Sequence, residues 1–147
     1  MITDDNRGKG MGDEMADVSK AYGEGKHPIP AIAAATVIFM INHSLAGHPW
    51  TEVNIYRATQ CAWGVGPETR AKAVYALGVS HGVVRGAYRI ERWRQVTDRH
   101  WCFDGRSAPE LNDVVGKSIA RLKAGQGAST SFRVFLDGIL APASEQN

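Results

Sequence analysis

Aromatic and arginine residues alternate through the middle of the chain, and this pattern is the one best able to bind a ligand. An arginine beside an aromatic ring offers a cation for a phosphate and a flat surface for a base. The aromatic residues are Trp63, Tyr75, Tyr88, Trp93 and Trp101, and the arginines are Arg57, Arg70, Arg85, Arg89, Arg92, Arg94 and Arg99. The pattern favours nucleic-acid binding; the alternative is that the rings form the core and the arginines are solvated.

The net charge of +2 conceals an uneven distribution. The first 24 residues hold three basic and six acidic residues, whereas the segment 57–133 holds 13 basic and six acidic residues. A basic body rich in arginine suits a partner that carries phosphates. We therefore expect RNA or DNA as the partner, with ordinary surface charge as the alternative.

Motifs for catalysis or metal binding are weak in this sequence. The five histidines, His27, His43, His48, His81 and His100, form no zinc-ligand pattern. There is no Gly-x-Ser-x-Gly phrase and no P-loop. We expect a binding protein without metal or cofactor rather than an enzyme, although a small-molecule enzyme with an unfamiliar site is an alternative.

The two cysteines, Cys61 and Cys102, lie far apart and form no CxxC motif. A single bridge is open to them, but two scattered cysteines predict separate buried thiols in a reducing cytosol. Residues 1–28 lack the apolar stretch of a signal peptide. The longest apolar run, 31–41, is about half the ~20 residues of a membrane helix. These features predict a cytoplasmic protein with no membrane partner.

An amphipathic helix is predicted near the N-terminus. Met11, Met15, Val18 and Tyr22 fall at i, i+4, i+7 and i+11, which places them on one helix face. This face could form a homodimer or dock on a larger partner as an accessory subunit. We expect residues 1–28 to be a tail with this helix, 29–140 to be a single domain and 141–147 to be a C-terminal tail.

The central part of the chain alternates strand and helix signals. The run 36–42 is apolar and β-branched and predicts a buried strand. Thr51 can cap a helix over 52–62, and Pro67 can open a short helix through Lys72. The runs 74–80 and 83–90 flank His81-Gly82, which predicts a β-hairpin.

The second strand of this hairpin alternates apolar and charged residues. Val84, Tyr88 and Ile90 should form its apolar face, whereas Arg85 and Arg89 should leave the opposite, solvated face together. Arg92 continues the basic run. We expect Arg85, Arg89 and Arg92 to contact phosphates.

The C-terminal third predicts a strand over 100–103, a turn at Asp104-Gly105 and a helix. Ser107 and Glu110 make a capping box for that helix. Its apolar stripe is Leu111, Val114, Val115, Ile119 and Leu122, with Gly125 at the C-terminal cap. A last strand covers 132–136. Together these elements predict an α+β fold with a small, mixed, curled sheet and three to four helices.

The segment 36–93 resembles the PUA-like domains, which include the EVE and ASCH families. The matching features are VIFMIN, the stretch from Tyr56-Arg57 to Trp63-Gly64, and GVVRGAYRIERW, whose opening Gly82-Val83-Val84-Arg85-Gly86 matches a Gly-apolar-apolar-x-Gly phrase. The ASCH phrase Gly-x-Lys-x-x-Glu is absent. The resemblance implies a small pseudo-barrel that binds RNA or a modified DNA base without catalysis.

On this interpretation a base stacks on Trp63 or Trp93, and its polar edge meets Asn42 or His81. Arg57, near the start of the aromatic segment, completes the expected nucleic-acid site. An alternative resemblance is to the GIY-YIG nucleases. Gly82-Val83-Val84 to Tyr88 and Val114-Val115-Gly116-Lys117-Ser118 are similar to the two half-motifs, but the tyrosines of both are missing.

Overall fold

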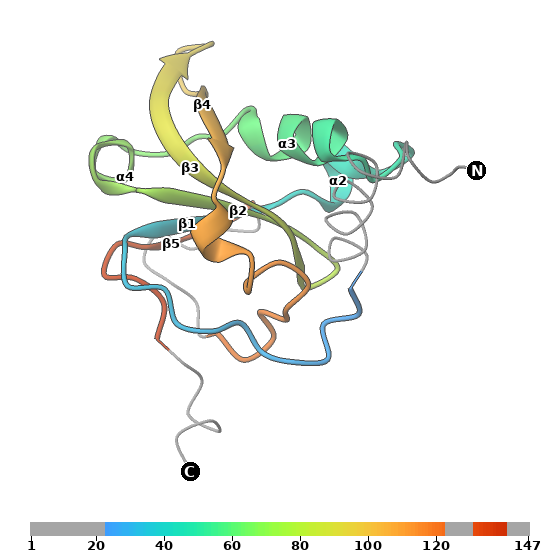
Figure 1. The fold of residues 1–147 in the computed structure, drawn as a ribbon. Helices are drawn as coiled ribbons and strands as arrows, with labels where there is room; N and C mark the ends of the chain where they lie inside the picture. The colour runs from blue at the N-terminus through green and yellow to red at the C-terminus, as the bar shows by residue number, and fades with distance from the viewer. Residues whose placement is uncertain (1–22, 123–130, 141–147) are drawn as a thin grey trace, which may run out of the picture.

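The computed structural model describes residues 23–122 and 131–140, which form an α+β unit around one mixed sheet (Figure 1). The sheet has five strands in the order β4-β3-β2-β1-β5, and it is not closed into a barrel. The strands are β1 (Thr36–Met40), β2 (Tyr75–Ser80), β3 (Val83–Gln95), β4 (Trp101–Ser107) and β5 (Phe132–Phe135). The helices are α2 (Asn42–Leu45), α3 (Glu52–Gln60), α4 (Pro67–Lys72) and a short 3-10 helix, η1 (Pro109–Leu111).

The three α-helices form the crossover between the two parallel strands of the sheet. β1 pairs with β2 in parallel, whereas every other neighbouring pair is antiparallel. The predicted cap is confirmed, because the Thr51 hydroxyl accepts a hydrogen bond from the Asn54 amide at 3.1 Å. Pro67 opens α4 as predicted. The predicted first strand is shorter than expected, because Asn42 already begins α2.

The predicted hairpin is confirmed. β2 and β3 turn at His81 and Gly82, whose φ angles of 54° and 76° match a tight turn of the kind that joins twisted strands. Beyond the part that pairs with β2, β3 continues with β4 as a projecting two-stranded arm (Figure 1).

A β-bulge at Arg85 changes which face each residue of β3 presents. Val79 pairs with Val84, but Gly78 pairs with Gly86, so β3 has one extra residue at this point. Val84 therefore packs in the core on one face of the sheet and Tyr88 in the core on the other. The prediction that these two residues share one face is wrong, because the alternation assumed an uninterrupted strand.

Both faces of the sheet are covered by apolar residues. Phe39 and Phe103 lie in the core beneath α3, with Ile55 and Ala58 from the helix. Leu77 and the other residues on the opposite face pack against irregular segments. Figure 1 shows these segments below the strands, one before β1 (blue) and one after β4 (orange), whereas α3 crosses above.

The predicted C-terminal helix is wrong. β4 runs through Asp104 and Gly105, and the chain then forms η1 and a series of turns. Contacts with a distant strand explain the difference. These turns supply hydrogen bonds to the edge of β3 that β4 does not cover, and the Gly116 amide donates to the Val84 carbonyl at 2.8 Å. Gly116 has a φ of 91°, which an α-helix does not allow. The apolar stripe is still used, since Leu111, Val114 and Ile119 are buried.

Cys61 and Cys102 form a disulfide, so the prediction of two separate thiols is wrong. Their Cα atoms are 4.4 Å apart. Trp63 and Trp101 bring the two segments together, because each donates its backbone amide to the other's carbonyl, at 2.8 and 2.9 Å. This pairing joins the end of α3 to the start of β4, a contact that no sequence motif indicates.

The predicted helix containing Met11, Met15, Val18 and Tyr22 lies outside the described residues, as does Gly125. The predicted domain, 29–140, begins and ends with segments that pair, because Ile32 and Ile139 exchange backbone hydrogen bonds of 2.8 Å. None of the helices in the described part of the chain has the length and apolar character needed to cross a membrane.

Candidate binding pocket between α3 and β3

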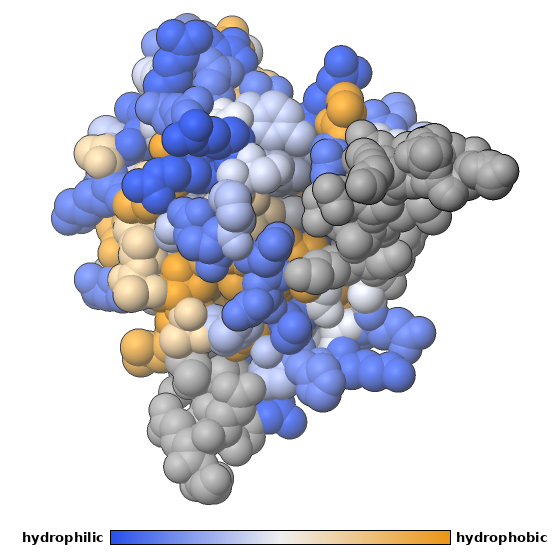
Figure 2. Space-filling view, in the orientation of Figure 1, coloured by the Kyte–Doolittle hydropathy of each residue, from blue (hydrophilic) through white to orange (hydrophobic). Residues whose placement is uncertain are grey.

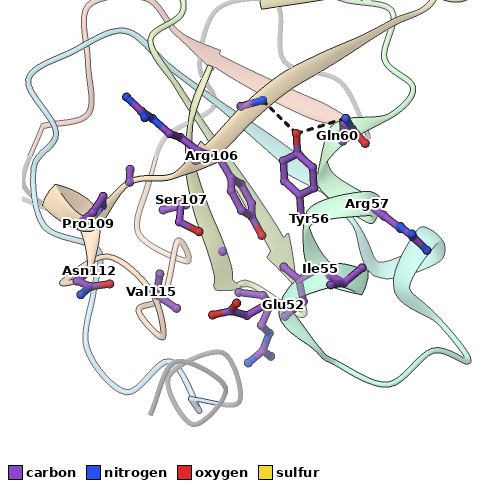
Figure 3. Close-up of a pocket in the computed structure, with 17 residues that line it drawn as sticks. Glu52, Ile55, Tyr56, Arg57, Gln60, Arg106, Ser107, Pro109, Asn112 and Val115 are labelled. Carbon is purple, nitrogen blue, oxygen red and sulfur yellow. Dashed lines mark hydrogen bonds between the residues drawn. The ribbon is translucent and has the colours of Figure 1, made fainter. Parts of the chain in front are cut away.

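A pocket of about 520 Å³ lies between α3 and strand β3 (Figure 3). β4 stops pairing with β3 at Ser107, which faces Tyr88, so the space beside the first half of β3 is not filled by a strand. Small residues form this part of the wall, among them Gly86, Ala87 and Ala108. The volume falls in the range of pockets that bind small ligands or single bases.

Tyr88 forms the aromatic floor of the pocket. Its residue surface is only 6% exposed, and its ring packs edge-on against Tyr56 with centroids 5.1 Å apart. The Tyr88 hydroxyl has no hydrogen-bond partner in the part of the chain that the structure describes. Burial raises the pKa of this phenol, and the nearby charge of Glu52 raises it further, so the hydroxyl stays protonated. It is a neutral donor on a residue that lines the pocket.

Tyr56 differs from Tyr88 because its hydroxyl is engaged. It accepts hydrogen bonds from the Gln60 side chain at 3.3 Å and from the Gly105 amide at 3.0 Å (dashed lines in Figure 3). The Gln60 amide also donates to Asp104 at 3.3 Å. These contacts fix the upper end of the α3 wall against β4.

Arg85 is buried at the pocket wall, so the prediction that it is solvated is wrong. It is 7% exposed, and its guanidinium lies 4.5 Å from the centre of the Trp50 ring. It donates to the Ser80 carbonyl at 3.2 Å and to the Gly23 carbonyl at 2.8 Å. Burial lowers the pKa of Arg85, but an arginine keeps its charge in proteins. The bulge turns this side chain toward Trp50 instead of toward solvent.

Arg57 and Arg106 add positive charge to the rim of the pocket. Both are exposed and project from opposite walls, one from α3 and the other from β4 (Figure 3). Arg106 pairs with Glu91 at 3.2 Å. Arg57 makes no ion pair with any described residue.

The structure places the predicted site residues in several separate regions. Arg57 and Arg85 line the pocket. Trp63 does not, because it is 7% exposed and its ring stacks on Phe39 with centroids 4.4 Å apart. Its indole N–H donates to the Thr59 carbonyl at 2.7 Å. A base could stack on Trp63 only if the core opened, so the expected role of this residue is not compatible with the fold.

Arg89 and Arg92 do not form an open row of cations. Arg89 pairs with Glu110 at 3.2 Å beside Tyr75, whereas Arg92 pairs with Asp104 at 2.7 Å. Arg85 contacts Trp50 beside the helix-side core and Arg89 contacts Tyr75 in the other core, so the two side chains do not leave the sheet together. Figure 2 shows hydrophilic residues over the projecting β3–β4 arm, at the top of the view.

The remaining predicted residues lie away from the pocket. Asn42 and His81 contact each other at the hairpin turn, where the His81 amide donates to the Asn42 side chain at 3.1 Å. Trp93 is half-buried on the arm, edge-on to Phe103 with centroids 5.8 Å apart. Its indole N–H is buried and has no hydrogen-bond partner within the described residues.

The segments that resemble the GIY-YIG half-motifs lie side by side. The Val84 amide donates to the Lys117 carbonyl at 2.9 Å, and Val83 bridges Ser118. The second segment is not on a helix, contrary to the prediction.

Apart from Arg57, the α3 wall of the pocket was not predicted from the sequence. Glu52, Tyr56 and Gln60 recur every four residues, which places them on one helix face. Polar and aromatic residues at that spacing are a signal that could have identified the wall. Tyr88 belongs to the aromatic and arginine pattern in the sequence, but its place on the predicted apolar face of the second hairpin strand indicated only a role in the core.

The fold and site together define an α+β protein with an open mixed sheet and a pocket walled by a helix and two strands. No group of three or more His, Cys, Asp and Glu side chains within the described ranges could hold a metal ion. No protein family, curated protein or solved structure matches the chain.

Proposed function

We propose that this protein is a non-catalytic binding module for nucleic acid, and that a single base occupies the pocket between α3 and β3. The pocket that holds Tyr88 and Arg85 carries this proposal, because it joins an apolar aromatic floor to a buried cation. A base taken out of its stack needs such a space, with flat apolar walls and a few polar groups for its edge. The PUA-like assignment belongs to the same proposal.

The exposed arginines that line the pocket favour nucleic acid over an isolated small molecule as the ligand. A base in the pocket remains attached to its sugar and phosphates, which must lie at the mouth. Arg57 and Arg106 are exposed residues on opposite sides of the pocket lining. Phosphates bound by arginines displace counterions, and this makes the affinity sensitive to salt.

The test is a fluorescence-anisotropy titration with single-stranded RNA, single-stranded DNA and duplex DNA containing a mismatched or methylated base. We expect binding that weakens as salt is added. Arg57→Glu should weaken it more than Arg99→Glu, a matched control that changes the same charge at an exposed arginine outside the pocket. Equal losses of affinity in the two variants would show that binding depends on overall charge alone and not on the pocket. Absence of binding to every probe would overturn the proposal.

A further inference from the structure

We infer that the Tyr88 hydroxyl is the specificity-determining group of the pocket and donates a hydrogen bond to an acceptor on the inner edge of the base. This inference rests on the proposed function. The ligand class that it names is a base whose buried edge presents a carbonyl oxygen or an unprotonated ring nitrogen. Such an edge is what a neutral phenol at the bottom of a pocket can distinguish.

The first support is the absence of a protein partner for this hydroxyl. Tyr88 is only 6% exposed as a residue, yet its hydroxyl is not among the buried polar atoms that lack a partner, so the oxygen keeps some exposure. Tyr56, on the facing wall, differs because its oxygen accepts hydrogen bonds from two donors. No described residue bonds to the Tyr88 hydroxyl in this way. The hydroxyl belongs to a residue that lines a ligand-sized pocket, so it is a donor that a ligand can reach and engage.

The second support is that the backbone is shaped around this hydroxyl. A Cβ atom on Gly86 would lie 2.9 Å from the Tyr88 Cζ atom and 3.0 Å from Ile55. The first distance is shorter than real Cβ atoms show, and the second is tighter than most real Cβ contacts. Glycine at position 86 therefore keeps the space in which the phenol ends, and the ring cannot swing away because Tyr56 and Phe103 pack against it.

The experiment compares wild type with Tyr88→Phe on two probes. One probe is a single-stranded DNA of a single base type and the other is its abasic counterpart, and all four base types are tested. We expect Tyr88→Phe to weaken binding of the preferred base roughly tenfold, because the base acceptor is left buried without a partner. Binding of the abasic strand, which leaves the pocket empty, should be the same for both proteins.

Thermal melting is measured in parallel to separate a ligand contact from a structural one. Tyr88→Phe removes no hydrogen bond within the described residues, so its melting temperature should equal or exceed that of wild type. Tyr56→Phe is the matched control for stability: it should melt lower, because the Tyr56 hydroxyl bonds to Gln60 and Gly105.

Each outcome decides a different question. If Tyr88→Phe binds bases as well as wild type, or loses affinity equally for the abasic strand, the inference is wrong and the proposed function stands. If Tyr88→Phe melts well below wild type, the hydroxyl has a structural partner and the inference is again wrong. If wild type binds none of the probes, both the proposed function and the inference fail.

Discussion

The Cys61–Cys102 disulfide should contribute a large share of the stability of this protein. The bond closes a loop with a sequence separation of 41 residues, which contains the whole of α4, β2 and β3. Cross-linking a loop of this length restricts the unfolded chain, and the chain-entropy relation gives about 4 kcal/mol at 25 °C. Since a domain is stable by roughly 5–15 kcal/mol, reduction should bring this one close to its unfolding threshold.

Urea denaturation of the oxidised protein and of the same protein in a phosphine reductant measures this contribution. With a urea slope of about 2 kcal/mol/M, the midpoint should fall by roughly 2 M on reduction. The variant Cys61→Ala/Cys102→Ala should have a low midpoint that the reductant does not change. This control separates the bond from any general effect of the reductant.

The reasoning would be refuted by a midpoint that is the same with and without reductant. Alkylation of the denatured, unreduced protein gives a second measurement, and labelling of both cysteines would show that the bond does not form. The result also bears on location, because the predicted reducing cytoplasm would keep these thiols apart. The cytoplasmic location stays a prediction.

Three further changes test other parts of the structure. Arg85→Ala should lower the free energy of unfolding by roughly 2–4 kcal/mol, since it opens a cavity and leaves buried carbonyls without a donor; a urea midpoint equal to that of wild type would contradict the buried placement. Gly86→Ala should lower the free energy of unfolding by about 1–3 kcal/mol through overpacking against Tyr88. A thermal melt that matches wild type would show that Tyr88 can move to make room for the added methyl group. Hydrogen bonds, first from Arg92 and then from Arg94, hold the pKa of Asp104 below its ordinary value. The stability that the ionised Asp104 contributes is therefore present above about pH 4 and is lost as pH falls through the lowered pKa. The melting temperature of Asp104→Asn should accordingly fall less than that of wild type between pH 5 and pH 3.

Elements that depend on neighbouring residues could be predicted from the sequence. Thr51 caps α3, Pro67 opens α4 and His81-Gly82 turns the hairpin, and each of these signals acts within a few positions of the chain. The last strand, β5, was also predicted at its observed place. Local propensity was enough in these segments because tertiary contacts favour the same conformation.

Elements that depend on distant contacts could not be predicted. Ser107 and Glu110 make a sound capping box, yet Ser107 extends β4 because it pairs with Tyr88. The bulge at Arg85 is defined only by the register against β2, and it reverses the face assigned to each residue before it. The apolar pattern showed which residues are buried but not which conformation buries them.

The candidate site was predicted only in part for the same reason. Arg57 and Arg85 lie at the pocket, whereas the expected stacking residue Trp63 is needed by the core. An aromatic residue in a sequence has the same appearance whether its ring faces Phe39 or a ligand. The two cases separate only when the packing around each ring is known.

The pairing of Ile32 with Ile139 has a consequence for the architecture of longer proteins. These residues lie near the two ends of the described unit, and their mutual hydrogen bonds hold the entering and leaving chain side by side. A unit with adjacent ends can be placed within a surface loop of another protein without separating the two sides of that loop. The same geometry allows circular permutation, in which a short linker joins the ends and new termini are cut elsewhere. This fold is thus suited to be carried as an insertion as well as to stand at the end of a chain.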